Sequence, residues 1–225
     1  MTAPTTPPSQ TVEDYLKTIY SLGERGEPSV TTTGLSEQLG LSASTVSGML
    51  RKLTAQGLIE HEPYGDITLT DAGRTIALAV VRRHRLVEMF LVSHLDYRWD
   101  EVHQEAEVLE HAVSDLLIAR IDAALGRPQF DPHGDPIPSV TGEVPVVAGK
   151  RMSALPPGSA GTLVRVDDHD RKVLAHLTQI GITLGERIEL LEQLPFGGGQ
   201  LIRTSDRATH QFPPALAAAL WISLT

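Results

Sequence analysis

The chain contains no cysteine among its 225 residues. It can therefore form no disulfide and offer no thiolate ligand, so any bound metal ion must be held by nitrogen and oxygen atoms. That donor set disfavours a structural zinc site and suits Mn²⁺ or Fe²⁺. No apolar run approaches the roughly 18 residues of a membrane span, and the start MTAPTTPPSQ lacks the regions of a signal peptide. We expect a cytoplasmic protein that does not enter membranes.

Charge and composition bound the function further. The formal net charge of −9 argues against a general nucleic-acid coat, although it allows sequence-specific binding by a local patch. A hydrophobic content of 41% indicates a globular protein, and the length allows one large domain or two to three small ones.

A polar stripe dominates the middle of the chain. A helix is expected from about Trp99 to Leu125, with small or apolar residues on its other faces. At about 100° per residue, four side chains of this helix fall within an arc of roughly 100°. They are His103, Glu107, Glu110 and His111. Two imidazoles and two carboxylates therefore converge on one face.

A second pair at helical spacing, His84 and Glu88, lies on the preceding long helix, which is expected from Asp71 to Leu91 or Leu95 with Arg82, Arg83 and Arg85 exposed. Two neighbouring helices that each offer His and Glu indicate a divalent metal site. The alternative is a charged stripe that pairs with arginines.

The first part of the chain has the order of a helix-turn-helix. After a tail at residues 1–10, helical patterns cover residues 12–22 and 34–39, and a Ser-capped helix follows at 42–53. Its hydroxyl and basic groups suit base edges and phosphates. We predict DNA contacts for Ser42, Ser44, Thr45, Ser47, Arg51 and Lys52.

Residues 57–70 alternate like strands around a turn at residues 63–66, which predicts a β-hairpin wing directly after the helix-turn-helix. Helix-turn-helix patterns also occur as packing units without DNA, but the wing favours a DNA-binding winged helix. Acidic residues outnumber basic ones in residues 1–73, so nonspecific affinity for DNA should be weak.

The remaining segments suggest three domains. Two long helices with excess apolar surface usually bury it against a second copy, which predicts a homodimer. Residues 126–138 are rich in Pro and Gly and form a linker. Short Gly-punctuated apolar runs beyond residue 146, with a helical piece at 172–177, predict a small β-barrel. The expected domains are 1–73, 74–145 and 146–225.

With these segments placed, the chain resembles the DtxR/MntR family of metal-dependent transcriptional repressors over nearly its full length. The fold implied is mainly α with α+β: a winged helix-turn-helix, a helical dimerisation domain and an SH3-like (FeoA-like) barrel. The motifs that carry the resemblance are VEDYLKTIY (12–20), STVS (44–47), RHRLVE (83–88), EVLEH (107–111) and DPHGDPIP (131–138).

The resemblance implies two metal sites per subunit. The primary site would comprise Asp14, Glu107, Glu110 and His111. The ancillary site would comprise His84, Glu88 and His103, completed by Asp168 and His169 from the barrel.

Two positions separate the branches of the family. The iron-responsive branch usually has Met and Cys where this chain has Asp14 and Glu107, whereas the manganese branch has carboxylates at both. Hard oxygen donors favour Mn²⁺. However, the manganese branch tends to carry an acid where Lys17 stands, and its short members lack the barrel, so the arrangement predicted here is a hybrid. In the recognition helix, Gly48 stands where many relatives carry a larger polar side chain.

The resemblance implies a repressor, not an enzyme, that binds double-stranded operator DNA as a dimer when loaded with Mn(II) or Fe(II). One alternative is a hydrolytic enzyme with a two-metal centre, but no base, nucleophile or oxyanion donor clusters with the ligands, and a catalytic metal needs an open position. Another is a metal-independent winged-helix regulator that binds a small molecule; it leaves the polar stripe unexplained.

Overall fold

The computed structural model describes residues 8–25, 29–61 and 65–224, which fall into two compact units. The first comprises residues up to 83 together with 138–143, and the second comprises 84–137 and 144–224. Most of the predicted tail at 1–10 and part of the predicted wing turn at 63–66 lie outside the described residues. No described helix is both long and apolar enough to cross a membrane.

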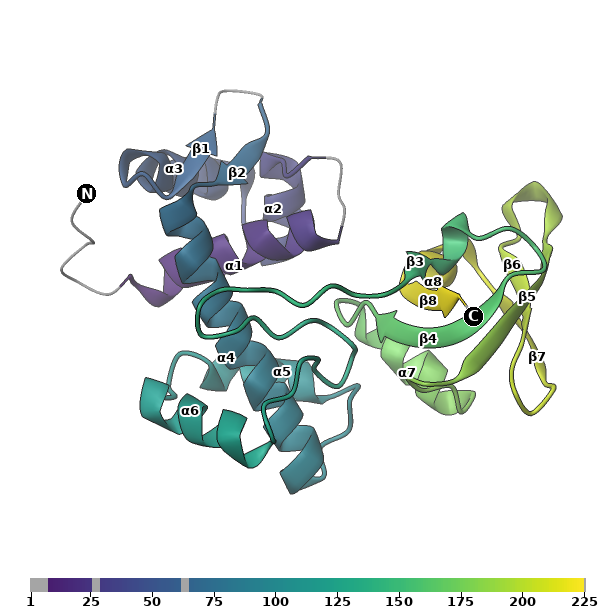
Figure 1. Cartoon of the computed structure of the whole chain (residues 1–225). Helices are drawn as coiled ribbons and strands as arrows, with labels where there is room; N and C mark the ends of the chain where they lie inside the picture. Colours follow the sequence, from purple (N-terminus) through teal and green to yellow (C-terminus); the bar gives the residue numbers. More distant parts are fainter. Residues whose placement is uncertain (1–7, 26–28, 62–64, 225) are drawn as a thin grey trace. The chain divides into compact units, whose positions relative to one another are not determined.

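The first unit is a winged helix-turn-helix, as predicted. Its elements are α1 (Gln10–Glu24), α2 (Thr32–Leu39), α3 (Ala43–Ala55), β1 (Ile59–His61), β2 (Ile67–Leu69) and the first half of α4 (Asp71–Leu95). Gly40 ends α2 in a left-handed conformation (φ 64°), and the Ser42 hydroxyl caps α3 by accepting the backbone N–H of Thr45. Leu35, Val46 and Leu50 are fully buried between the helices. The antiparallel wing strands lie beside α3 (Figure 1).

The helical part of the second unit contains the rest of α4, then α5 (Val102–Leu109) and α6 (Asp115–Ala124). The single helix predicted from Trp99 to Leu125 is wrong in this respect. Glu110 is the C-cap of α5, and the Ser114 hydroxyl starts α6 by accepting the backbone N–H of Leu117. Glu110 and His111 therefore lie just beyond the end of α5.

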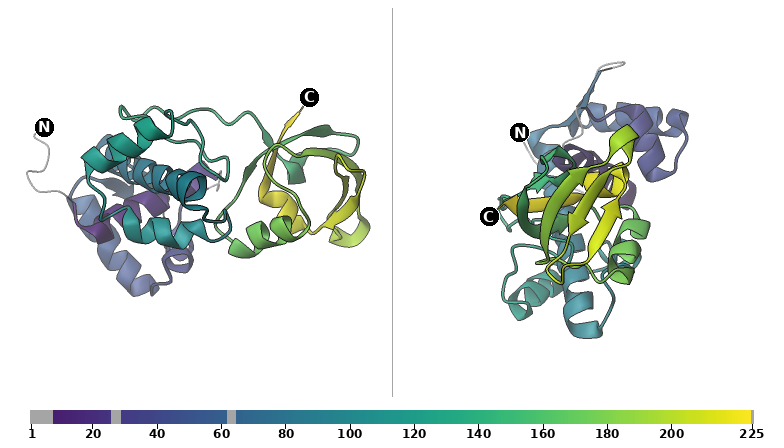
Figure 2. Two further views of the ribbon diagram at one scale, coloured as in Figure 1. Left: turned by 90° about the horizontal axis from the view of Figure 1, so that it is seen from below. Right: turned by 90° about the vertical axis from the view of Figure 1, so that its right-hand side faces the viewer.

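The C-terminal part of the second unit is the predicted small barrel, whose curled sheet is seen in Figure 2. Its elements are β3 (Lys150–Arg151), a 3₁₀ turn η1 (Met152–Ala154), β4 (Ala160–Val166), α7 (Arg171–Gln179), β5 (Arg187–Gln193), a second turn η2 (Pro195–Gly197), β6 (Gln200–Arg203), β7 (Thr209–Phe212), α8 (Pro214–Ala218) and β8 (Leu220–Leu224). The strands pair antiparallel in the order β3-β8-β4-β5-β6-β7.

Alternating side chains of the barrel strands, among them Leu163, Leu190 and Ile202, form its core. Trp99, from the helical part of the same unit, packs against this core, and its indole N–H donates a 2.7 Å hydrogen bond to the Thr178 hydroxyl on α7. The barrel and the helical part of the second unit are therefore in direct contact.

Candidate metal centre

Helix α4 presents His84 and Glu88 one turn apart, and both side chains are buried. His84 Nε2 lies 3.0 Å from Glu88 Oε1, while His84 Nδ1 lies 2.6 Å from Glu110 Oε2. Both ring nitrogens of one buried imidazole thus face carboxylate oxygens. Arg85, predicted to be exposed, is instead buried next to His84, because its guanidinium donates a 2.5 Å hydrogen bond to the carbonyl of Pro136.

Four predicted ancillary residues come together around Glu88. When one ligand atom is taken from each residue, the four atoms all lie within 4.8 Å of one another. The residues are His84, Glu88, His103 and Asp168. Ligands about 2.1 Å from a small divalent ion lie at most about 4.2 Å apart, so modest side-chain adjustments would complete a coordination shell. The four residues come from α4, α5 and the loop after β4.

A second set of ligand atoms adjoins the first, formed by Glu88, Asp131 and His133, all of them buried. Glu88 belongs to both sets, and we call their six residues, from His84 to Asp168, the interior group. Glu88 Oε2, Asp131 Oδ2 and His133 Nδ1 are buried without a hydrogen-bond partner. Buried polar atoms normally find a partner, so unpartnered oxygen and nitrogen atoms facing one another fit a divalent ion.

The backbone also fixes which nitrogen of His133 carries a proton. His133 Nε2 lies 2.7 Å from the carbonyl oxygen of Trp99, which can only accept a hydrogen bond. The proton of neutral His133 therefore sits on Nε2, and its Nδ1 lone pair faces Glu88 Oε2 at 3.7 Å and Asp168 Oδ2 at 3.9 Å. Metal-binding histidines in proteins are commonly held by such a bond from the other ring nitrogen.

Without metal, protons offset the negative charge of the interior group. Burial would lower the pKa of His103, but the carboxylates of Asp168 and Glu88 outweigh it and raise this pKa to about 10. Burial likewise opposes the charged form of His133, yet Glu88 holds its pKa well above the usual value. Burial, and then the neighbouring Asp135, raise the pKa of Asp131 to about 8. A divalent ion would have to displace these protons.

The predicted primary residues of the second unit lie around the end of α5, and we call Glu107, Glu110 and His111 the helix-end group. Glu110 is fully buried, His111 is nearly so, and the side chain of Glu107 is 42% exposed. His111 Nε2 lies 3.4 Å from Glu110 Oε1. The fourth predicted ligand, Asp14, lies on α1 in the first unit.

The structure separates the two residues predicted for the barrel loop. Asp168 is buried against His103, whereas His169 is exposed and is not one of the described residues that form the interior group. Sequence reasoning missed Asp131 and His133 by treating DPHGDP as a linker. The available signal was a histidine between two aspartates in a Pro- and Gly-rich turn, where the backbone is too constrained to be a loose connection.

The six predicted DNA-contacting residues are all exposed at the start and along the outer face of α3. The Ser42 hydroxyl is partly engaged, since it caps the helix and lies 2.8 Å from the Ser44 hydroxyl.

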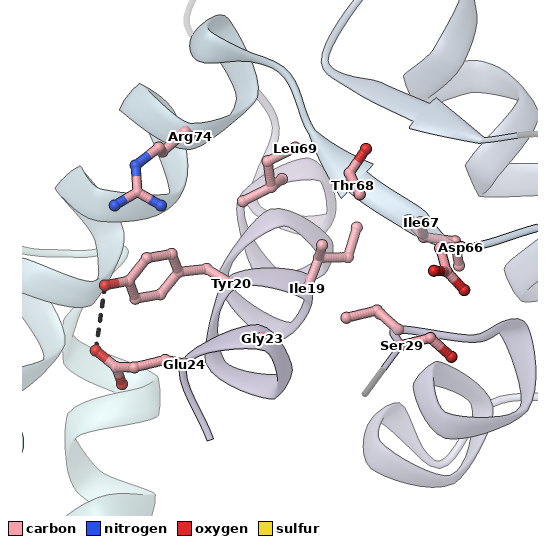
Figure 3. Close-up of a pocket in the computed structure, with 11 residues that line it drawn as sticks. Ile19, Tyr20, Gly23, Glu24, Ser29, Asp66, Ile67, Thr68, Leu69 and Arg74 are labelled. Carbon is pink, nitrogen blue, oxygen red and sulfur yellow. Dashed lines mark hydrogen bonds between the residues drawn. The ribbon is translucent and has the colours of Figure 1, made fainter. Parts of the chain in front are cut away.

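The first unit also has a cavity of about 470 Å³ between α1, β2 and the start of α4 (Figure 3). The Tyr20 hydroxyl donates a 3.1 Å hydrogen bond to Glu24 at its edge. Its described lining is mixed, with Asp66 and Arg74 beside apolar side chains, and includes no histidine. Its chemistry therefore differs from that of the metal-ligand groups.

Three family models together match most of the chain. Residues 9–67 match "Iron dependent repressor, N-terminal DNA binding domain", residues 70–139 match "Iron dependent repressor, metal binding and dimerisation domain", and residues 150–224 match "FeoA domain".

Named relatives agree with these models. The iron-dependent repressor IdeR of Mycobacterium tuberculosis is 32% identical over 204 residues, covering 85% of this chain and 88% of that protein. The diphtheria toxin repressor of Corynebacterium glutamicum is 30% identical over 221 residues, covering 93% and 94%.

Solved structures extend the similarity to three dimensions. A manganese-dependent transcriptional repressor in complex with manganese is 49% identical, with a TM-score of 0.91 over 95% of this chain and 100% of that one. The manganese regulator SloR is 35% identical, with a TM-score of 0.82 over 98% and 100%. Repressors of this kind bind DNA and are not enzymes, and the hydrolase alternative has no support. The chain belongs to the DtxR/MntR family of metal-dependent transcriptional repressors.

Proposed function

We propose that this repressor responds to Mn(II), with Fe(II) as the competing activator, and that two ions per subunit allow a homodimer to bind double-stranded operator DNA in the cytoplasm. The observation that carries the choice of metal is the donor set. Every candidate ligand is a carboxylate or an imidazole, in a chain with no cysteine. Hard oxygen donors favour Mn²⁺ over softer metals. A relative 49% identical is described as manganese-dependent.

One ion would be held by the helix-end group together with Asp14, as the family resemblance implies. Asp14 belongs to the DNA-binding unit and the other three ligands to the second unit. An ion shared by all four would tie the two units together and so select the arrangement that fits DNA.

The second ion would bind in the interior group, through His84, Glu88, His103 and Asp168 with Asp131 and His133 beside them. Carboxylates buried this close together repel one another, and a divalent ion offsets that repulsion. His169, which is exposed, would contribute least.

Apolar side chains on the surface of the second unit support the homodimer. Val108 and Leu116 are each 69% exposed, and Leu95 and Leu117 are 54% and 46% exposed. Four large apolar side chains this exposed on α4, α5 and α6 are what a helical domain that pairs with a second copy would offer for burial.

Fluorescence anisotropy with operator DNA tests this proposal. Candidate operators would come from genomic fragments that the purified protein retains in the presence of Mn²⁺. Binding should require Mn²⁺ and be reversed by EDTA. Metal analysis of the dimer after desalting should give two Mn²⁺ per subunit. Metal-independent binding would contradict the proposal, and a count of one or three ions would revise the assignment of the ligands.

A further inference from the structure

The segment that carries Asp131 and His133 is a tight turn, residues 130–137, which we call the docked turn. Asp131 Oδ1 accepts the backbone N–H groups of His133 and Asp135 at 2.8 and 2.9 Å. The backbone N–H of Asp131 donates in return to the carbonyl of Asp135 at 2.9 Å. The turn is therefore internally rigid, and the position of His133 depends on where the whole turn is placed.

Strand β4 of the barrel contacts the docked turn through its backbone. Val166 N–H donates a 2.9 Å hydrogen bond to the carbonyl of His133. Gly134, at φ +84°, leaves so little room that an added Cβ would lie 2.1 Å from the carbonyl oxygen of Val164. The pairing of β4 with β8 shifts register between Leu163 and Arg165, as at a β-bulge. Such irregularities redirect side chains, and Arg165 and Val166 are both buried although they are consecutive.

The redirected Arg165 makes an ion pair with Asp135 of the docked turn, from Nε to Oδ1. The two side chains are only 6% and 7% exposed. The Arg165 guanidinium also lies over the Trp221 ring of β8, 4.7 Å from its centroid. Removing one partner of such a buried pair leaves an uncompensated charge, which costs more than the pair contributes.

Arg85 holds the opposite side of the same turn. This α4 residue bonds the carbonyl of Pro136, and its Nε lies 3.7 Å from Asp131 Oδ2. Glu88 of the interior group follows on the same helix. The docked turn is thus held between α4, which carries one set of candidate ligands, and β4, which leads directly to Asp168.

We propose that Arg165 and Asp135 are a positioning pair for the interior metal site, which rests on the function proposed above for that site. Neither residue is a candidate ligand. Their contact fixes the docked turn on β4 and so sets the 3.9 Å spacing between His133 Nδ1 and Asp168 Oδ2. Without the contact between Arg165 and Asp135, the segments that carry His133 and Asp168 can separate. The ion would then lose part of its coordination shell.

The test compares Mn²⁺ binding by full-length Arg165→Gln, Arg165→Lys and Arg203→Gln proteins, using the electron paramagnetic resonance signal of free aqueous Mn²⁺. Arg203 is the matched control, since it pairs with Glu189 in the same barrel at 3.8 Å with both side chains 44% exposed. Arg165→Gln should lower the affinity for one of the two Mn²⁺ ions about tenfold or more, as loss of a residue that supports metal ligands does. Arg165→Lys keeps the charge and should lower this affinity less. Arg203→Gln should leave the affinity for both ions unchanged.

Thermal unfolding in EDTA separates positioning from stability. A purely structural role would lower the melting temperature of the Arg165 variants while both ions kept wild-type affinity, and that result overturns the proposal. If Arg165→Gln does not fold, Asp135→Asn, which removes the charge of the other partner, takes its place, and wild-type Mn²⁺ affinity in that variant overturns the proposal equally. Glu88→Gln tests the site itself. If this variant also binds two ions normally, the interior site is wrong; if it loses an ion while the Arg165 variants do not, only the positioning role fails.

Discussion

The helix-end group and the interior group use the same side-chain chemistry but are built differently. Glu107, Glu110 and His111 lie within five consecutive residues at the end of α5, and Glu107 remains 42% exposed. The interior group draws on α4, α5, the docked turn and the loop after β4, and Glu88 and His133 at its centre are fully inaccessible. Local spacing can thus bring three candidate ligands together, whereas the interior group forms only when distant segments pack.

This difference predicts different sensitivities. Three of the four proposed ligands of the first site come from one helix end, with Asp14 as the fourth, so that site should depend mainly on its own ligands. A site assembled from four segments depends also on whatever holds those segments together. Mutations should therefore separate the two groups, and the experiments below run from the largest expected effect to the smallest.

The largest effect is expected from Glu107→Ala or His111→Ala. Each removes a proposed ligand of the ion that would link the DNA-binding unit to the rest. Glu107→Ala is the cleaner test, because its side chain is 42% exposed whereas that of His111 is 11% exposed. We expect at least about 100-fold weaker Mn²⁺-dependent operator binding with the dimer intact. Anisotropy titrations and light scattering measure the two quantities. Glu105→Ala, on the same helix, is the control, and wild-type operator affinity of Glu107→Ala at saturating Mn²⁺ would contradict the site.

A smaller effect is expected from loss of Asp168, which closes the interior group from the barrel side. Asp168→Ala should weaken the interior ion about 10- to 100-fold and raise the Mn²⁺ concentration needed for operator binding, without abolishing it. His169→Ala, one residue away and exposed, should behave like the wild type. Removal of residues 146–225 should resemble Asp168→Ala in the metal requirement. Equal Mn²⁺ affinities for Asp168→Ala and His169→Ala would show that the loop holds no ion.

The choice of metal should respond to the donor at position 107. Glu107→Cys replaces a hard oxygen with a soft sulfur, so activation should shift by about tenfold toward Fe²⁺, Co²⁺ or Ni²⁺ relative to Mn²⁺. Anaerobic operator titrations with each metal give the ranking. The same order for both proteins would argue against donor softness as the basis of selectivity.

The smallest predicted effect is the pH dependence of the interior ion. The raised pKa values of His103, about 10, and Asp131, about 8, mean that both groups hold protons at neutral pH in the metal-free protein. Metal and protons compete, so affinity must rise with pH, about threefold per half unit for each proton displaced. Calorimetry at pH 7.0 and 7.5 in two buffers counts the protons. The affinity for the helix-end ion should change less with pH. The same pH dependence for both ions would contradict this difference between the two sites.

The same contrast explains what the sequence could predict. The winged helix, the long α4 and the small barrel follow from periodic apolar residues, glycines and caps, which are local properties. The break after Leu109 was missed because apolar spacing continues across it, although Ser114 is a recognisable cap. Asp131 and His133 were missed because their proximity to Glu88 arises only when the turn docks. The burial of Arg85 depends on the same contact.

Gly134 shows how narrow the tolerance of the docked turn is. A single methyl group there would meet the backbone of β4 at 2.1 Å, and the left-handed conformation independently disfavours any side chain. One carbon atom would thus push the barrel away from the histidine that precedes it in sequence. A mutation of Gly134 can therefore change the distance between the barrel and the helices of the second unit, although glycine has no charge and no side chain that could bind metal. A substitution at Gly134 should therefore weaken Mn²⁺ binding at the proposed interior site while every candidate ligand stays the same.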